Sequence, residues 1–275
     1  MDKTKITFVG GGNMSFAIVR GLGESSPYDI HVSEPSSERA AWLREHAPFT
    51  TVHADNLRAC HGAAQVVLAV KPQIMAPVCA NLAEAAIKPE LGFASIAAGI
   101  ATTSLERWLG NPAAVIRVMP NQAAFVGHSM TVLYAAQKVS KSARDLAQEL
   151  LATVGQTLWL DDEALMDAAT AVSGSGPGFL YRVFEVMVDA ACELGFTPAQ
   201  ADTLVRATAL GAGTVVTQNQ QELSALRASV TSPGGTTEAG LLALAEADIR
   251  AIFIKALTAA RDKGRHLRSA SEKDS

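Results

Sequence analysis

The sequence lacks most of the features that mark secreted, membrane-embedded or nucleic-acid-binding proteins. It has three cysteines among 275 residues, an odd number at wide spacing, which favours reduced thiols over a disulfide framework. No apolar run reaches the roughly 20 residues of a membrane-spanning helix, and residues 1–5 lead directly into a strand pattern instead of a signal peptide. With a net charge of −4 and scattered Lys and Arg side chains, nucleic acid is not an expected partner. We therefore predict a cytoplasmic protein that binds neither a membrane nor nucleic acid.

The usual groupings of metal-binding and nucleophilic side chains are also missing. The six histidines, at positions 31, 46, 53, 61, 128 and 266, have no ligand spacing, so we expect no metal site. Ser173-Gly174-Ser175-Gly176-Pro177 has the glycines of a nucleophile elbow, but it lies between helical patterns and has no plausible histidine partner. We interpret this run as a tight loop between helices that reaches toward a cofactor, with Ser175 capping the next helix.

What the sequence does contain, from Lys5 to about Leu160, is an alternation of β-branched runs with helical patterns. The predicted strands cover residues 6–9, 30–33, 66–70, 92–96, 115–118, 130–133 and 157–160. Such alternation implies βαβ units and a mostly parallel sheet. Strands that are apolar on both faces, such as the one near 65–70, require helices on both sides of the sheet. Residues 1–161 are therefore predicted to form an α/β, Rossmann-type doubly wound domain.

Strand patterns stop after Asp162, and residues 162–275 have helical composition almost throughout. Within residues 179–194 the charged side chains form one narrow stripe at helical spacing, and apolar residues occupy every other side. A domain of roughly a hundred residues has little room to enclose such a helix, so we expect another subunit to cover it. The alternative is the central helix of a monomeric bundle. The sequence thus predicts an all-α C-terminal dimerisation domain over 162–275, with residues 269–275 frayed.

The first strand pattern runs into a glycine turn, Gly10-Gly11-Gly12-Asn13-Met14-Ser15, and then into a helix. This order is typical of the first βα turn of a dinucleotide-binding fold. Gly10 is expected to make the turn and Gly12 to admit the pyrophosphate to the backbone. The helix from Asn13 supplies its dipole, and Ser15 replaces the third glycine of the fingerprint.

The residues at the end of the second strand pattern are compatible with NAD and with NADP. Glu34 would accept hydrogen bonds from the adenosine ribose hydroxyls and favour NAD. Ser33, Ser36, Ser37 and Arg39 surround it, and hydroxyls with an arginine can hold the 2′-phosphate of NADP. A solvated loop with no cofactor role is the third possibility.

Three later strand ends are expected to complete the cofactor crevice. Lys71, in Val70-Lys71-Pro72, either contacts the cofactor or is a solvated lysine at a strand end. Ala98 and Gly99 leave room for the nicotinamide, and Asn121 offers an amide that can orient a carboxamide or a substrate.

A loop of small residues and hydroxyls, 230–237, lies between two helical patterns. Pro233, Gly234 and Gly235 break the preceding helix, and the hydroxyls are expected to cap a helix that starts at Glu238. Backbone N–H groups at a helix start suit a small anion such as a carboxylate.

A reductase without a strong acid–base residue needs a substrate that demands little proton transfer. An imine meets this requirement, because its nitrogen is protonated near neutral pH and the iminium then accepts a hydride at carbon. Thr237 is placed to orient or relay the proton, an effect worth about 10²–10⁴ in rate. The substrate carboxylate would rest on the N–H groups that follow Gly234 and Gly235.

Six motifs, in order from Lys5 to about His266, resemble the pyrroline-5-carboxylate reductase family. They are Gly10-Gly11-Gly12-Asn13-Met14, Ala69-Val70-Lys71-Pro72, Ser95-Ile96-Ala97-Ala98-Gly99-Ile100, Arg117-Val118-Met119-Pro120-Asn121, Ser173-Gly174-Ser175-Gly176-Pro177 and residues 231–237. The resemblance implies an NAD(P)-dependent oxidoreductase acting on a CH–NH group. Its reaction would be the last step of proline biosynthesis, reduction of 1-pyrroline-5-carboxylate to L-proline.

The resemblance also implies roles for residues of this sequence. Gly12, Asn13 and Met14 would bind the dinucleotide, and Ala69, Lys71 and Pro72 would line its site. Thr237 would donate to the ring nitrogen. The residues expected to surround the substrate carboxylate are Ser232, Gly234, Gly235 and Thr236.

The family's helical domain pairs with its twin, so the resemblance implies a homodimer, and many members assemble further into decamers. Members usually favour NADPH, which makes NADP(H) the expected cofactor, while the acid at Glu34 leaves NAD(H) open. Two further departures are Gln122-Ala123, where the family commonly has Thr-Pro, and Phe179, where Ala-Tyr is usual after the glycine.

Two alternatives stay open from the residues alone. A β-hydroxyacid dehydrogenase of related architecture normally needs a lysine in the helical domain, and no lysine occurs between Lys141 and Lys255. A nucleotide-sensing dimer would not need to keep the hydroxyls of Thr236 and Thr237.

Overall fold

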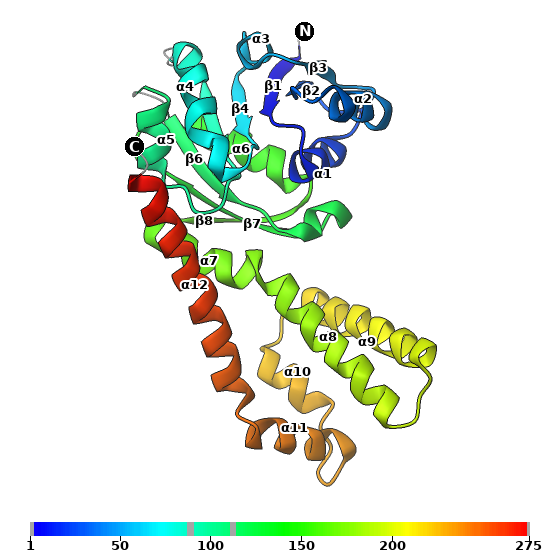
Figure 1. The fold of residues 1–275 in the computed structure, drawn as a ribbon. Helices are drawn as coiled ribbons and strands as arrows, with labels where there is room; N and C mark the ends of the chain where they lie inside the picture. Colours follow the sequence, from blue (N-terminus) through cyan, green and yellow to red (C-terminus); the bar gives the residue numbers. More distant parts are fainter. Residues whose placement is uncertain (1–2, 87–90, 111–113, 274–275) are drawn as a thin grey trace. The chain divides into compact units, whose positions relative to one another are not determined.

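The computed structural model describes residues 3–86, 91–110 and 114–273. The chain divides into two units (Figure 1). Unit 1 comprises Met1–Ser175 together with Ala259–Ser275, and unit 2 comprises Gly176–Thr258.

Unit 1 contains a sheet of eight described strands in the order β3-β2-β1-β4-β5-β6-β7-β8. All neighbouring strands are parallel except β6 and β7, which pair antiparallel. The predicted doubly wound sheet is therefore confirmed, with an eighth strand that the sequence pattern did not indicate. The strands are β1 Thr4–Val9, β2 Tyr28–Ser33, β3 Thr51–His53, β4 Gln65–Leu68, β5 Gly92–Ser95, β6 Ala114–Met119, β7 Ser129–Ala135 and β8 Gly155–Leu160.

Helices cover both faces of the sheet, as the doubly apolar strands predicted. On β4, Val67 packs into one buried cluster with Ile18 of α1 and Leu150 of α6. Its neighbours Val66 and Leu68 point the opposite way, into a second cluster with helices α4 and α5. Helices of this unit are α1 Asn13–Leu22, α2 Ser37–His46, α3 Asn56–Cys60, α4 Met75–Ala86, α5 Thr102–Trp108, α6 Lys141–Ala152 and α7 Met166–Ala169.

Unit 2 is helical and has almost no interior of its own. It contains α8 Gly176–Glu193, α9 Pro198–Gln218, α10 Leu223–Ser229, α11 Thr236–Glu246 and the beginning of α12 Ile249–Lys273. Among residues 176–258, all of which the structure describes, only Ala201 and Val205 of α9 are buried apolar side chains. On α8, Tyr181, Val186 and Met187 are between two fifths and about half exposed. A single chain thus leaves α8 uncovered, which is the situation the sequence pattern predicted.

The Ser173–Pro177 run does not form the predicted loop. A π-helical turn, Thr170–Gly174, joins α7 directly to α8, with the Ser175 N–H donating to the Thr170 carbonyl over 2.8 Å. Proline has no N–H, so Pro177 cannot donate to the carbonyl four residues earlier, and the helix leaves its regular ladder here without unwinding.

The predicted fraying of residues 269–275 was wrong for its larger part. Helix α12 continues to Lys273, while residues 274 and 275 lie outside the described residues. The Ser271 hydroxyl shares its proton between the Arg268 carbonyl of its own helix, at 2.7 Å, and the Gly99 carbonyl, at 3.2 Å. The second contact joins the last turns of α12 to the rest of unit 1.

Candidate dinucleotide and carboxylate sites

The glycine turn after β1 leaves the backbone open at the start of α1. Gly10 has a φ of +102°, and a Cβ there would meet the Ala69 carbonyl oxygen at 2.8 Å, so only glycine fits. At Gly12 an added Cβ would meet nothing within 4 Å, which leaves open space beside the backbone. No side chain of the described residues caps α1, so its first N–H groups are available to an anion.

Glu34 lies against this turn and is hydrogen-bonded by backbone. Its Oε2 accepts from the Gly11 N–H over 3.0 Å, and its Oε1 accepts from the Ser36 N–H over 2.9 Å. Ser33 is buried, and its hydroxyl donates to Asn56 Oδ1 over 2.7 Å. Ser33 and Glu34 were both predicted to contact the cofactor. Glu34 faces the turn, and Ser33 faces the interior.

Arg39 lies at the same turn as the acid. Its Nε donates to the Gly11 carbonyl over 2.7 Å, and its guanidinium stacks over Trp42 at 4.0 Å from the ring centre. One of its terminal nitrogens, Nη2, is buried with no hydrogen-bond partner among the described residues. The turn thus presents a carboxylate and a guanidinium donor side by side.

The other predicted cofactor residues follow neighbouring strands. Strands β1, β4, β5 and β6 are adjacent and parallel, so their carboxyl ends meet at one edge of the sheet. This topology places the segments from Gly10, Ala69, Ala98 and Asn121 along that edge. Lys71 is exposed, and a short 3-10 helix begins at Pro72.

Asn121 is more constrained than the sequence indicated. Its Nδ2 donates to the Ser173 carbonyl over 2.9 Å, and its Oδ1 accepts from the Ala123 N–H over 3.0 Å. The first bond satisfies the carbonyl that Pro177 leaves without a helical partner. One N–H of the amide is left for a ligand.

A charge cluster in unit 1, formed by Arg117, Asp167 and Glu163, was not predicted from the sequence. Arg117 on β6 is 2% exposed and lies 3.0 Å from Asp167 Oδ1 and 3.3 Å from Glu163 Oε1. The available signal was an arginine in the middle of the apolar strand 114–119, which a folded protein must pair with a carboxylate.

The 230–237 loop, within unit 2, binds a carboxylate of its own chain. The Gly234 N–H donates to Glu238 Oε2 over 2.7 Å, and the Gly235 N–H donates to the Ser232 carbonyl over 2.9 Å. Gly234 has a φ of +69°, which explains the glycine at that position.

The predicted start and capping of the following helix were both wrong. Helix α11 begins at Thr236, two residues before Glu238, and no side chain of the described residues caps it. The Thr236 and Thr237 hydroxyls therefore lie in the first helical turn, on exposed residues, instead of capping it. Ser232 is also exposed.

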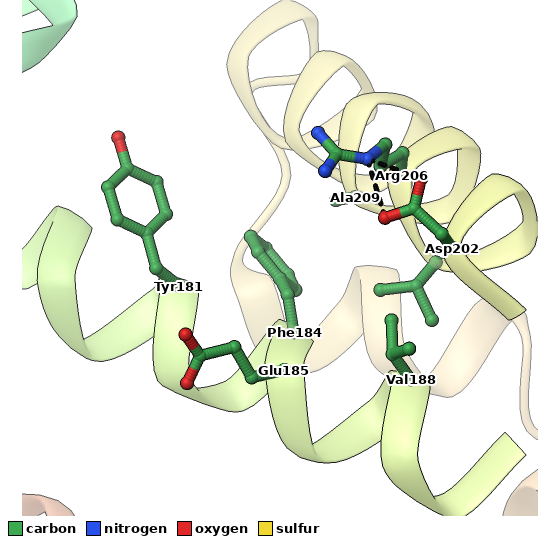
Figure 2. A pocket seen from close by; sticks show the side chains of 8 residues that line it. Tyr181, Phe184, Glu185, Val188, Asp202, Arg206 and Ala209 are labelled. Atoms are coloured by element: carbon green, nitrogen blue, oxygen red, sulfur yellow. Dashed lines mark hydrogen bonds and ion pairs between the residues drawn. The ribbon is translucent and has the colours of Figure 1, made fainter. Parts of the chain in front are cut away.

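Unit 2 also has a groove of about 530 Å³ between α8 and α9 (Figure 2). Apolar side chains of Phe184, Val188 and Val205 form much of its lining. On its α9 wall, Arg206 Nε lies 2.7 Å from Asp202 Oδ2, and this hydrogen-bonded ion pair raises the pKa of Arg206. The groove holds none of the predicted cofactor or substrate residues.

Two of the cysteines are buried, and the described residues form no metal-binding group. Burial raises the pKa of the Cys60 and Cys79 thiols to about 12, so both stay protonated and unreactive. Among residues 3–86, 91–110 and 114–273, no group of three or more His, Cys, Asp or Glu side chains could hold a metal ion. None of the helices in these ranges combines the length and the apolar character needed to cross a membrane.

Two family models match the chain. The family described as pyrroline-5-carboxylate reductase dimerisation matches residues 163–267, and that described as NADP oxidoreductase, coenzyme F420-dependent, matches residues 5–103. The first match shows that the helical part is an oligomerisation element, in agreement with the uncovered face of α8.

Relatives and solved structures cover nearly the whole chain. A pyrroline-5-carboxylate reductase from Pseudomonas aeruginosa is 41% identical over 97% of this chain and 98% of its own length. One from Haemophilus influenzae is 41% identical over 88% of this chain and 89% of its own. The structure of a pyrroline-5-carboxylate reductase from Coxiella burnetii superposes with a TM-score of 0.91 at 36% identity, covering 97% and 99% of the two chains. A Plasmodium falciparum pyrroline carboxylate reductase with NADP bound gives a TM-score of 0.83 at 25% identity, covering 98% and 99%.

Proposed function

Because the chain belongs to the pyrroline-5-carboxylate reductase family, we propose that it reduces 1-pyrroline-5-carboxylate to L-proline with a nicotinamide dinucleotide. It is an NAD(P)-dependent oxidoreductase of the CH–NH class. The observation that carries the proposal is that one chain spans the family's full length and keeps both the open glycine turn at Gly12 and the exposed loop at Gly234.

The dinucleotide is proposed to lie along the edge formed by the ends of β1, β4, β5 and β6. Its pyrophosphate would rest on the backbone at the start of α1, where Gly12 leaves space and the N–H groups are uncapped by described side chains. When bound, the reduced nicotinamide supplies the hydride. The proposed cofactor residues are Gly10, Gly12, Asn13, Met14, Ser33, Glu34, Ala69, Lys71, Pro72, Ala98, Gly99 and Asn121.

We propose that NADP(H) is preferred and that NAD(H) is also used. The buried Nη2 of Arg39 has no partner among the described residues and offers a charged donor to a 2′-phosphate. Against this, Glu34 places a negative charge beside the same turn. Since the Glu34 oxygens already accept two backbone N–H groups, the carboxylate is less free to take the ribose hydroxyls that would favour NAD.

The substrate carboxylate is proposed to bind at Ser232, Gly234, Gly235 and Thr236. The hydrogen bond from Gly234 to Glu238 supports this, because a backbone N–H of the loop there donates to a carboxylate oxygen. A substrate carboxylate would take the place of Glu238 there.

Thr237 is then proposed to orient the ring nitrogen and relay a proton from water to it as the imine carbon accepts the hydride. Its hydroxyl lies on an exposed residue in the first turn of α11, where it is not used as a cap. Assistance of this kind is worth about 10²–10⁴ in rate.

The assembly is proposed to be a homodimer through the helical domain, with dimers able to assemble further into decamers. We propose that residues 1–161 serve the dinucleotide and residues 162–275 serve dimerisation and substrate. The protonated, buried thiols of Cys60 and Cys79 fit work in a reducing cytoplasm.

A single spectrophotometric assay tests the reaction. Oxidation of NADPH and of NADH is followed with and without 1-pyrroline-5-carboxylate, and proline is identified as the product. We expect turnover with both cofactors and a higher kcat/KM with NADPH. Absence of substrate-dependent oxidation with either cofactor would refute the proposed function, and a β-hydroxyacid with NADP⁺ serves as the arm for the alternative dehydrogenase class.

A further inference from the structure

Unit 1 contains a neutral cluster of four charged side chains drawn from distant parts of the sequence. Asp167, which is 1% exposed, lies between two guanidinium groups, Arg117 Nη2 at 3.0 Å and Arg268 Nε at 3.1 Å. Glu163 pairs with the other terminal nitrogen of Arg117 at 3.3 Å. The Arg268 contact is an ion pair without hydrogen-bond alignment. Two positive and two negative charges therefore balance, with Arg117 and Asp167 buried and with Glu163 and Arg268 partly exposed.

Arg268 is the member of this cluster that lies on α12, and its charge completes the balance. Without it, the carboxylates of Asp167 and Glu163 would share one guanidinium. An uncompensated buried charge is strongly unfavourable, so Arg268 attaches the end of α12 to β6 and α7. Its side chain is 27% exposed, which leaves the attachment reachable by water.

The same end of α12 packs on Gly99. The Ser271 hydroxyl, which donates to the Arg268 carbonyl at 2.7 Å, also lies 3.2 Å from the Gly99 carbonyl. A Cβ at Gly99 would meet Leu267 Cβ at 3.1 Å. Gly99 has a φ of +73°, a conformation that a side chain would strain. One turn earlier, Gly264 lies close to Asp167, with an added Cβ 3.6 Å from that of Asp167.

Gly99 belongs to the segment 97–102, which follows β5 at the edge proposed to hold the cofactor. The far end of this segment is fixed by the charge cluster as well. Glu163 accepts from the Thr102 N–H over 2.9 Å and from the Thr102 hydroxyl over 2.7 Å. The segment is thus held at Gly99 by α12 and at Thr102 by a carboxylate that Arg117 pairs with.

We propose that Arg268 is a positioning residue of the reductase. It holds the last turns of α12 against the segment 97–102 and so fixes the nicotinamide end of the dinucleotide site. The proposal rests on the proposed function, because that function gives Ala98 and Gly99 their place beside the nicotinamide. Arg268 itself acts through Asp167 and the Gly99 segment.

The test compares Arg268→Met and Arg268→Lys with a matched control, Arg265→Met. Arg265 lies three residues earlier on the same helix, is half exposed, and pairs at 3.8 Å with Asp262 of its own helix. A fourth variant, Ser271→Ala, loosens the contact with Gly99 and leaves the charge cluster intact. Each protein is measured for NADPH dissociation constant, KM, kcat, melting temperature and the primary isotope effect with NADPH deuterated at the transferred position.

For Arg268→Met we expect NADPH affinity to fall about tenfold, with a lower kcat and a larger isotope effect, because a misplaced nicotinamide slows hydride transfer. Arg268→Lys keeps the charge and should restore most of the affinity. Ser271→Ala should shift in the same direction as Arg268→Met by a smaller factor, and Arg265→Met should match the wild type.

A purely structural role for Arg268 would lower the active fraction and kcat while leaving the NADPH dissociation constant, KM and isotope effect unchanged. That result in a folded Arg268→Met protein, or no effect on any of these quantities, would overturn the proposal. Should Arg268→Met not fold, the decision passes to Ser271→Ala, in which an unchanged NADPH dissociation constant and isotope effect would overturn the proposal equally. The dissociation constant needs no imine substrate, so an inactive wild type would refute the proposed function while the affinity comparison still decided the role of Arg268.

Discussion

The side-chain amide of Asn121 donates to the backbone carbonyl of Ser173 over 2.9 Å, joining the loop after β6 to the helical turn before α8. That carbonyl lacks the usual helical partner, because the residue four positions later is Pro177. Asn121, 56 positions before Pro177 in the sequence, thus supplies the hydrogen bond that the proline cannot donate.

Asn121→Ala is expected to destabilise the protein by about 1–3 kcal/mol, since the Ser173 carbonyl and the Ala123 N–H both lose their partner. In a Pro177→Ala background the cost should be smaller, because the alanine brings a backbone N–H that can satisfy the Ser173 carbonyl. A double-mutant cycle by urea unfolding measures this coupling. Strictly additive effects would show that Pro177 does not set the role of Asn121.

Thr237→Ala is expected to lower kcat by about 10²-fold with NADPH affinity retained, because it removes the hydroxyl proposed to serve the imine nitrogen. Thr237→Ser keeps the hydroxyl and is the matched control. Steady-state kinetics and NADPH titration check both variants. Equal kcat in wild type and Thr237→Ala would remove Thr237 from the mechanism.

Glu34→Gln should raise the ratio of kcat/KM for NADPH over NADH by about tenfold, since a negative charge beside a 2′-phosphate is removed. The amide oxygen can still accept from Gly11 or Ser36, so the turn should keep its shape. Parallel assays with the two cofactors give the ratio. A fall in the ratio would indicate that Glu34 supports phosphate binding through Arg39 or the Gly11 turn.

Glu238→Gln should lower the KM for the imine substrate a few-fold, because a weaker internal ligand then competes for the Gly234 N–H. The loss of an acid from the first turn of α11 costs about 0.3–1 kcal/mol of helix stability, which thermal unfolding would report. A higher KM with an unchanged melting temperature would instead assign Glu238 a direct role in holding the substrate.

The His31–His53 pair predicts a pH dependence of stability. His53 Nε2 lies 2.7 Å from His31 Nδ1, and burial, followed by the positive charges of His31, Lys5 and Arg58, lowers the pKa of His53. Below about pH 6.5 the unfolded chain binds a proton at this residue that the folded chain does not, so the free energy of unfolding falls as pH falls.

His53→Gln should therefore flatten the fall in stability on the acid side of pH 6.5 and leave the slope above that pH unchanged. Urea unfolding at a series of pH values checks this. An unchanged slope in the variant would mean that another group titrates in that range.

Most strands of the sheet could be predicted because each of them has a recognisable apolar run in the sequence. Val66, Val67 and Leu68 are buried on both faces, and a doubly apolar run of that kind is visible without coordinates. Strand β3 was missed for the converse reason. Thr51–His53 is three residues long, pairs with β2 at the edge of the sheet and is partly exposed, so its sequence carries no apolar run.

The site was predictable where backbone geometry demands a residue type, as at Gly10 and Gly234. It was not predictable where a side chain pairs with a residue that is far away in the sequence. The pairing of Arg268 with Asp167 depends on how the chain returns on itself. Residues 269–273 likewise appeared frayed in the sequence, because the contacts of Arg268 with Asp167 and of Ser271 with Gly99 join α12 to residues far earlier in the chain.

Because unit 2 has a sparse interior, its stability in one chain depends on association with another chain. With Ala201 and Val205 as its buried apolar residues, the unit depends on oligomerisation for the rest of its core. A charge at Val186, about half exposed on α8, is expected to leave the nucleotide-binding half folded and to weaken association, so that unit 2 unfolds on dilution at concentrations where the unaltered chain stays folded.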